Sequence, residues 1–184
     1  MKKIIISGPG NSGSGAIIDL LAAHKDIYLP FYNQEFRIVN DPEGLSNLEN
    51  NLYENFSHNN TAYAFNKFEI FCNNLNKLKS KQKKIYPKNF KDDYSKFLKN
   101  IKLVEYNGLP QFQKFNLNYF EKIKFYFNRL ILRKKIRDIN IFKMNIPIDH
   151  EIFLRYSIGF INDVIKNSKE YNPDKIPLLD QSIN

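Results

Sequence analysis

The sequence predicts an α/β fold, with a mostly parallel sheet flanked by helices and a helix-rich insertion between its early and late strands. Three observations predict it. Residues 4–6, three isoleucines, lead directly into a glycine-rich turn and then into a helical pattern. A second short apolar run, KIPLLD at residues 175–180, lies near the end of the sequence. Helical segments separate the two runs, and parallel strands need such long crossover connections.

The elements near the N-terminus are a strand, a glycine loop and a helix, all within residues 4–24. In the helix, residues 16–24, apolar side chains follow three- and four-residue steps along one face. His24 is expected to pack against or cap the end of this helix. A second strand is predicted over residues 35–39, where EFRIV precedes NDPEG, a strong turn signal.

The middle of the chain, from about residue 66 to residue 100, is rich in lysine and aromatic residues and is broken once, at Tyr86 and Pro87. A long helix is predicted from about residue 117 to residue 138. Most of its charged residues lie off its apolar stripe, which consists of Phe120, Ile123, Phe127 and Leu130.

A further helix is predicted from about residue 149 to residue 167. Asp149 is a suitable N-cap, because its carboxylate can accept hydrogen bonds from the first free N–H groups. The apolar stripe of this helix consists of Phe153, Tyr156, Phe160 and Val164. The loop YNPD then leads into the strand predicted at residues 175–180.

Composition excludes several classes of protein. With 42% hydrophobic and 26% charged residues, the chain is globular rather than disordered. The single cysteine, Cys72, excludes a disulfide framework, and three scattered histidines predict no metal site. The apolar runs are too short for a spanning helix or a signal peptide, which predicts a cytoplasmic protein. The net charge of +9 suits an anionic partner, but 25 Asn and 23 Lys against 5 Ala also fit A- and T-rich codon usage.

The most informative segment is the glycine-rich turn, SGPGNSGSGAII at residues 7–18. Glycine tolerates positive φ and has no Cβ to keep a phosphate away from the backbone. The N–H groups of such a loop, at the positive end of the next helix, form a phosphate site. The alternative is a tight turn that serves only to pack the helix.

The spacing of Gly8 and Gly13 matches the start of the phosphate-binding loop, or P-loop, of ATPases and GTPases. Ser14 and Gly15 stand where that loop has lysine and a hydroxyl residue. Without the lysine charge and the hydroxyl ligand to magnesium, hydrolysis of ATP or GTP is disfavoured.

Four segments share one resemblance: NSGSG at residues 11–15, LLAAHKDI at 20–27, QEFRIVNDPEGLSNLENNL at 34–52 and LLDQSIN at 178–184. They are similar to sulfotransferases, in particular to the bacterial polysaccharide type. The resemblance implies a P-loop-type sheet and a sulfuryl donor, 3′-phosphoadenosine 5′-phosphosulfate. It further implies transfer of the sulfuryl group to a hydroxyl, for example of a polysaccharide, with no metal.

Two departures accompany the resemblance. Asn11 stands where many family members have a basic residue beside the sulfuryl group. The family's second donor-binding element, which holds the 3′-phosphate, is expected after the strand at residues 175–180. We therefore expect residues 1–184 to form a single sulfotransferase-like P-loop domain that lacks its C-terminal part.

The resemblance implies a donor site and two catalytic residues. The donor-binding residues are Gly10, Asn11, Ser12, Gly13, Ser14, Gly15 and Ala16. Glu35 is the expected base for the acceptor hydroxyl, and Arg37 the cation that Asn11 does not supply. The alternatives are that Glu35 is a surface carboxylate paired with Arg37, or that Arg37 bridges Glu35 or Asp41.

Two other functions stay open. One is a non-catalytic remnant or nucleotide-binding module. The other is a nucleotide kinase or NTPase with a degenerate loop, in which Asp180 ends a strand as a Walker-B carboxylate does. The basic residues of the long helix, which form either a solvated face or a surface for an anionic glycan or lipid, are Lys122, Lys124, Arg129, Arg133, Lys134, Lys135 and Arg137. A nucleic-acid partner is not expected, because no nucleic-acid-binding motif accompanies the charge.

Overall fold

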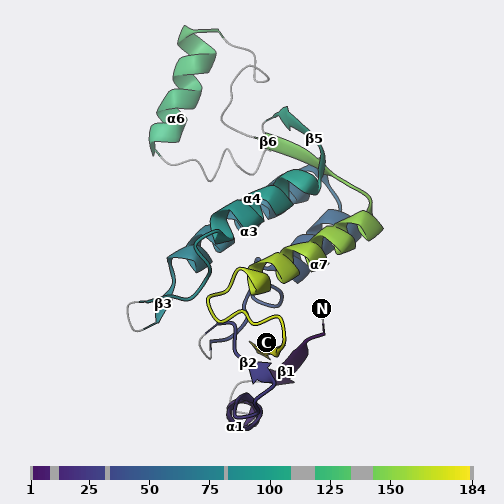
Figure 1. Cartoon of the computed structure of the whole chain (residues 1–184). Helices are drawn as coiled ribbons and strands as arrows, with labels where there is room; N and C mark the ends of the chain where they lie inside the picture. The colour runs from purple at the N-terminus through teal and green to yellow at the C-terminus, as the bar shows by residue number, and fades with distance from the viewer. Residues whose placement is uncertain are drawn as a thin grey trace.

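The computed structural model describes residues 2–8, 13–31, 34–80, 83–108, 119–133 and 143–182. Figure 1 shows their arrangement, in which η1 and η2 are π-helical segments. The elements in chain order are β1 (Ile4–Gly8), α1 (Ser14–Ala22), β2 (Ile27–Tyr28), α2 (Leu45–Glu49), η1 (Asn50–Glu54), α3 (His58–Lys77), β3 (Lys79–Ser80), β4 (Lys83–Lys84), α4 (Phe90–Asn100), β5 (Lys102–Asn107), α6 (Tyr119–Tyr126), η2 (Phe127–Ile131), β6 (Lys143–Pro147), α7 (His150–Lys166) and β7 (Ile176–Ser182).

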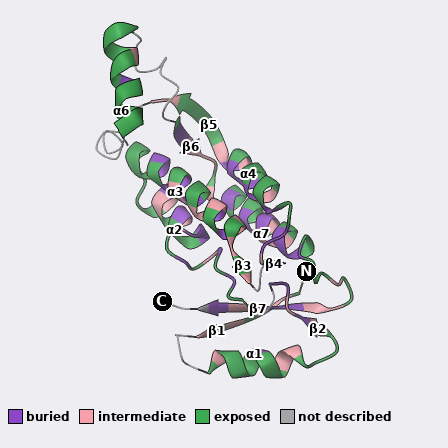
Figure 2. Cartoon of the chain, turned by 90° about the vertical axis from the view of Figure 1, so that its left-hand side faces the viewer, coloured by how far each residue is buried: buried purple, intermediate pink, exposed green. Residues whose placement is uncertain are grey.

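Three strands form a small parallel sheet in the order β1-β7-β2, with β7 parallel to both of its neighbours. Helix α1 lies on one side of this sheet and the helices of the insertion on the other (Figure 2). Successive strand residues point to opposite faces. Leu178 and Leu179 are accordingly both buried, and Leu179 belongs to the main core. The predicted α/β architecture with strands at both ends of the chain is confirmed.

The core of the insertion is aromatic. Phe160 of α7 stacks on Phe97 of α4, with ring centroids 4.9 Å apart and an interplanar angle of 14°. It also lies 6.2 Å from Phe90 of α4 and 6.5 Å from Phe68 of α3. One side chain thus joins three helices. Cys72 of α3 is fully buried in the same core, where it packs as a small hydrophobe.

The strand predicted at residues 35–39 is wrong, because this segment consists of coil and turns. The Ile38 carbonyl accepts a hydrogen bond from the N–H of Leu45 at 2.8 Å, which folds the segment back on α2. Phe36 and Ile38 are buried, so the apolar alternation that predicted a strand is satisfied without a strand ladder. The strand that pairs with β7 on the side away from β1 is β2 instead. The turn predicted from NDPEG is confirmed at residues 40–44.

The long helix predicted at residues 117–138 is described only over α6 and η2, and residues 117–118 and 134–138 lie outside the described part. Its predicted stripe faces solvent rather than a core. All four side chains of the stripe are exposed: Phe120, Ile123, Phe127 and Leu130. The buried side chain of α6 is Phe125, on a different face.

Helix α7 confirms the helix predicted from about residue 149 to residue 167 and its Asp149 cap. The Asp149 carboxylate accepts hydrogen bonds from the N–H groups of Glu151 at 2.9 Å and Ile152 at 3.4 Å. Tyr156 is 41% exposed, whereas the rest of the predicted stripe is buried. The buried members are Phe153, Phe160 and Val164.

Strands β5 and β6 pair antiparallel, which the sequence patterns did not predict. Leu103 and Val104 are both exposed, so β5 lacks the alternation that marks a half-buried strand. Glu105 accepts hydrogen bonds from Lys102 at 2.8 Å and from Lys143 of β6 at 2.7 Å. These two ammonium donors hold the pKa of Glu105 below its ordinary value.

Candidate functional site

Strand β1 ends at Gly8 and α1 begins at Ser14, at the carboxyl edge of the parallel sheet (Figure 1). Of the glycine-rich residues between these two elements, the structure describes Gly13. Gly13 is the N-cap of α1 and has a φ of 84°, a left-handed conformation that favours glycine. No side chain among the described residues caps α1, and no acidic residue lies in its first turn. The positive end of this helix therefore has no carboxylate of its own, unlike α7 with Asp149 and Glu151.

The surface around the start of α1 leaves room at its glycines. A Cβ added to Gly13 or Gly15 would meet no atom within 4 Å. The predicted donor-binding residues that the structure places at this helix end are Gly13, Ser14, Gly15 and Ala16. The remaining three, Gly10, Asn11 and Ser12, lie outside the described residues.

Strand β7 lies directly beside β1 and brings Asp180 to the same edge. Asp180 is in register with Ile6, two residues before the end of β1. The Asp180 carbonyl accepts a hydrogen bond from the N–H of Phe36 at 2.6 Å. This bond holds the segment with Glu35 on the side of β7 that faces away from β1.

Two carboxylates consequently lie close together at this edge. Burial raises the pKa of Asp180, and the negative charge of Glu35 raises it further, while the backbone N–H of Gln181 acts in the opposite direction. Glu35 itself is exposed. The proximity of Glu35 and Asp180 was missed by the sequence analysis. The one feature of the sequence that could have indicated this proximity was the position of Asp180 at the end of an apolar strand.

Arg37 is held by a carboxylate of its own turn. Its Nε donates to Oδ2 of Asp41 at 2.6 Å, and the Asp41 side chain is buried. The alternative in which Arg37 bridges Asp41 is therefore what the structure contains. Because Asp41 compensates part of the guanidinium charge, Arg37 adds less positive potential to the edge than an unpaired arginine would.

His24 lies just beyond α1 and stabilises the turn there. Its Nδ1 accepts a hydrogen bond from the N–H of Asp26 at 3.3 Å, and its carbonyl accepts one from Ile27 at 3.1 Å. The side chain is mostly exposed, so of the two expected roles it caps the turn rather than packing in a core.

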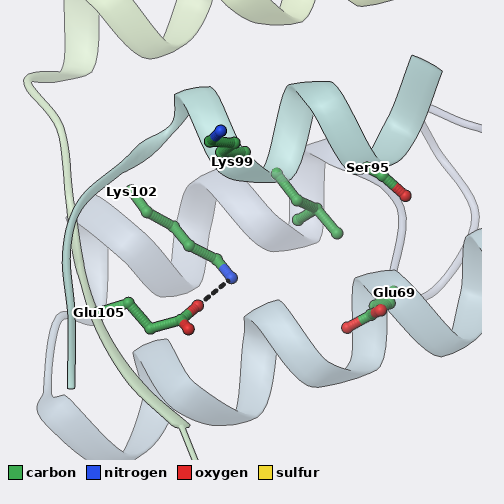
Figure 3. Close-up of a pocket in the computed structure, with 6 residues that line it drawn as sticks. Glu69, Ser95, Lys99, Lys102 and Glu105 are labelled. Atoms are coloured by element: carbon green, nitrogen blue, oxygen red, sulfur yellow. Dashed lines mark hydrogen bonds and ion pairs between the residues drawn. The ribbon is translucent and has the colours of Figure 1, made fainter. Parts of the chain in front are cut away.

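A cavity of about 540 Å³ lies elsewhere, where α3, α4 and the start of β5 meet (Figure 3). Its lining residues are Glu69, Ser95, Leu98, Lys99, Lys102 and Glu105. Lys102 and Glu105 point toward each other and form an ion pair at 2.8 Å. Two lysines and two glutamates line this cavity, so positive and negative charges balance. The cavity therefore has no net charge that would select a ligand.

Two kinds of feature are absent from the described residues. They contain no group of three or more His, Cys, Asp or Glu side chains that is placed to hold a metal ion. No helix among them is both long enough and apolar enough to pass through a membrane. No protein-family model, curated protein or solved structure matches the chain.

Proposed function

We propose that this chain is a sulfotransferase-like protein that binds 3′-phosphoadenosine 5′-phosphosulfate at the carboxyl edge of β1. In this proposal the sulfuryl group passes to a hydroxyl of an acceptor, with polysaccharides as the acceptor class. The donor-binding residues are the seven from Gly10 to Ala16, and the catalytic residues are Glu35 and Arg37.

The observation that carries the proposal is the start of α1. Its first-turn N–H groups lack a side-chain cap, the first turn lacks an acidic residue, and Gly13 takes the left-handed φ of 84° beside the end of a parallel strand. Helix N-termini with these properties bind phosphate and related anions. Ligands of open α/β sheets also bind outside the carboxyl ends of the strands.

The chemistry assigned to Glu35 is that of a general base. Its carboxylate accepts the proton of the acceptor hydroxyl while the hydroxyl oxygen forms a bond to sulfur. The bond between sulfur and the bridging phosphate oxygen breaks at the same time, and adenosine 3′,5′-bisphosphate leaves. The N–H groups at the start of α1 and the guanidinium of Arg37 stabilise the negative charge that moves to the leaving oxygen.

The first test measures the affinity for adenosine 3′,5′-bisphosphate by isothermal titration calorimetry, with the variant Ser14→Asp. An aspartate in the first turn stabilises a helix by about 0.3–1 kcal/mol but repels a phosphate there. We expect Ser14→Asp to keep or raise the melting temperature and to weaken binding by about tenfold or more.

Leu20→Asp is the matched control, because it adds the same charge to an exposed position of the same helix. Its affinity for the bisphosphate should stay within about twofold of the original chain, since charges beyond a Debye length are screened. Equal affinities for the original chain and Ser14→Asp would overturn the proposed site.

The role of Glu35 is tested by Glu35→Gln, which keeps the shape of the side chain and removes the base. If the chain transfers the sulfuryl group, turnover should fall by about 10²–10⁴-fold, while bisphosphate affinity stays unchanged. Unchanged turnover would remove Glu35 from the mechanism and leave the donor site in place.

A second candidate function, a magnesium-dependent nucleotide kinase or NTPase, is favoured by one observation. Asp180 lies on the strand next to β1, and Glu35 is close enough to raise its pKa. One or two carboxylates together with substrate phosphates are a usual set of Mg²⁺ ligands. Tighter binding of ADP with Mg²⁺ than of adenosine 3′,5′-bisphosphate would favour this candidate, and binding of neither would favour a non-catalytic module.

A further inference from the structure

Residues 119–133, which comprise α6, η2 and the two residues after them, form a segment that stands apart from the other described elements. It projects from the end at which β5 and β6 lie, far from the parallel sheet (Figure 1). Its two parts contact each other, and their contacts with the other described elements are marginal at most. Phe125 is the buried side chain of α6. The other sides of such a helix are expected to be polar, because an apolar face in water has no stabilising partner.

This helix is instead strongly apolar on one face. Phe120 is 80% exposed and Leu130 is 72% exposed. The other exposed apolar or aromatic side chains of the segment are Tyr119, Ile123, Tyr126, Phe127, Ile131 and Leu132. Most of these recur at three- and four-residue steps. Those of α6 therefore share one face of a helix with about 3.6 residues per turn, and Phe127, Leu130 and Ile131 continue the apolar surface into the wider turn of η2. Figure 2 shows the helix as almost entirely exposed.

Cations accompany this apolar face. The exposed basic residues of the segment are Lys122, Lys124, Arg129 and Arg133, against a single carboxylate, Glu121. By helical position Lys124 lies at one border of the apolar face, and Lys122 lies toward the other. Arg133, with a φ of 49°, lies beyond the end of η2. Long basic side chains in this arrangement can extend their charged ends into water while their stems lie along an apolar surface.

We propose that α6 and η2 bind the surface of an anionic lipid bilayer, with the apolar face in the headgroup region and the cations on lipid phosphates. This combination of an aromatic apolar face with flanking lysine and arginine characterises interfacial helices. A soluble polyanion such as a nucleic acid or an acidic glycan would use the cations and leave the apolar face in water. Negative lipid headgroups above a hydrocarbon layer match both parts of the surface.

The inference is independent of the proposed transferase activity, since it rests on residues far from the glycine loop. The probe is the full chain with vesicles of phosphatidylcholine alone or mixed with phosphatidylglycerol. The sequence contains no tryptophan, so Phe120→Trp introduces a single fluorescent reporter at an exposed position. We expect its emission to shift to the blue and to be quenched by brominated lipids when phosphatidylglycerol is present. Tyr156→Trp, on the exposed side of α7, should show neither effect.

Two matched pairs of variants separate the apolar and the electrostatic parts. Leu130→Ser should weaken vesicle binding about tenfold, whereas Leu20→Ser, at a position exposed to a similar 75%, should not change it. The double variant Lys122→Gln, Lys124→Gln should weaken binding to anionic vesicles about tenfold. Lys166→Gln, Lys169→Gln removes the same charge from the far end of α7 and should leave binding unchanged.

Three results would overturn the proposal. The first is an unshifted Phe120→Trp emission with anionic vesicles. The second is binding to anionic vesicles that Lys122→Gln, Lys124→Gln weakens and Leu130→Ser does not. Purely electrostatic attraction, without burial of the apolar face, would give that pattern. The third is concentration-dependent self-association, measured by sedimentation velocity without lipid and abolished by Leu130→Ser, because the apolar face would then be covered by a second copy of the chain.

Discussion

Asp180 illustrates how the neighbours of a single residue change its chemistry. In the sequence it is the last residue of an ordinary apolar strand, KIPLLD. In the structure it is partly buried beside Ile6 and close to Glu35, and both burial and the Glu35 charge oppose its ionisation. Its raised pKa means that the folded chain binds a proton on Asp180 more readily than the unfolded chain does.

This raised pKa gives a prediction for Asp180→Asn, which removes the unfavourable charge. Ionisation of Asp180 lowers stability as pH rises from the ordinary carboxyl pKa, about 4, to the higher value in the folded state. Asp180→Asn should therefore raise the melting temperature at neutral pH, and the gain should vanish below the ordinary carboxyl pKa. Thermal unfolding from acidic to neutral pH measures this, with the exposed Asp19→Asn as the control for loss of one charge. A loss of stability that persists at low pH would contradict it.

At the scale of elements, the N-termini of α7 and α1 differ in how their free N–H groups are satisfied. Helix α7 begins with a carboxylate cap, Asp149, and an acidic first turn. Helix α1 begins with Gly13 and has neither. A capped start stabilises its own helix, whereas an uncapped start at a sheet edge leaves its N–H groups for a ligand.

The cap of α7 predicts the effect of Asp149→Ala. Without the carboxylate, the N–H groups of Glu151 and Ile152 lose their acceptor, and unfolding free energy should fall by about 1 kcal/mol. Asp149→Ser, which keeps an oxygen acceptor, should recover most of the loss in urea unfolding followed by circular dichroism. Equal losses for both variants would show that the cap hydrogen bonds are not the source of the effect.

At the scale of the whole molecule, the helices of the insertion form the larger core and the parallel sheet joins its edge. Leu179 of β7 belongs to this core, so the sheet with the glycine loop depends on the helical layer for part of its burial. Phe160 is the side chain that connects α3, α4 and α7.

We therefore expect Phe160→Ala to lower the free energy of unfolding of the whole molecule. Removal of a large buried aromatic costs about 3–5 kcal/mol, because the cavity collapses only in part. Tyr156→Ala, on the exposed side of the same helix, should change stability by about 0.5 kcal/mol or less. Urea unfolding at matched temperature compares the two, and a loss below about 1 kcal/mol for Phe160→Ala would contradict this account of the core.

Local patterns were sufficient for the elements that local physics determines. The isoleucines of β1, the Asp149 cap and the apolar run of β7 each depend on neighbours within a few residues, and each prediction matches the structure. The strand prediction for residues 35–39 was wrong because it, too, used only a local pattern. Its alternation requires only that Phe36 and Ile38 be buried, and a turn buries them as well as a strand does.

Only the tertiary structure determined which strands and side chains are neighbours. The place of β7 between β1 and β2 and the effect of the Glu35 charge on Asp180 depend on residues far apart in the chain, and no pattern in the sequence specifies them. The pairing of Arg37 with Asp41 was one of the alternatives that the sequence left open, and the structure selected it. The apolar face of α6 is the clearest example, because periodicity showed which side is apolar and the structure showed that this side is uncovered. The physical reason is that burial and strand pairing are set by residues far apart in the chain, whereas propensity and periodicity act only over a few turns.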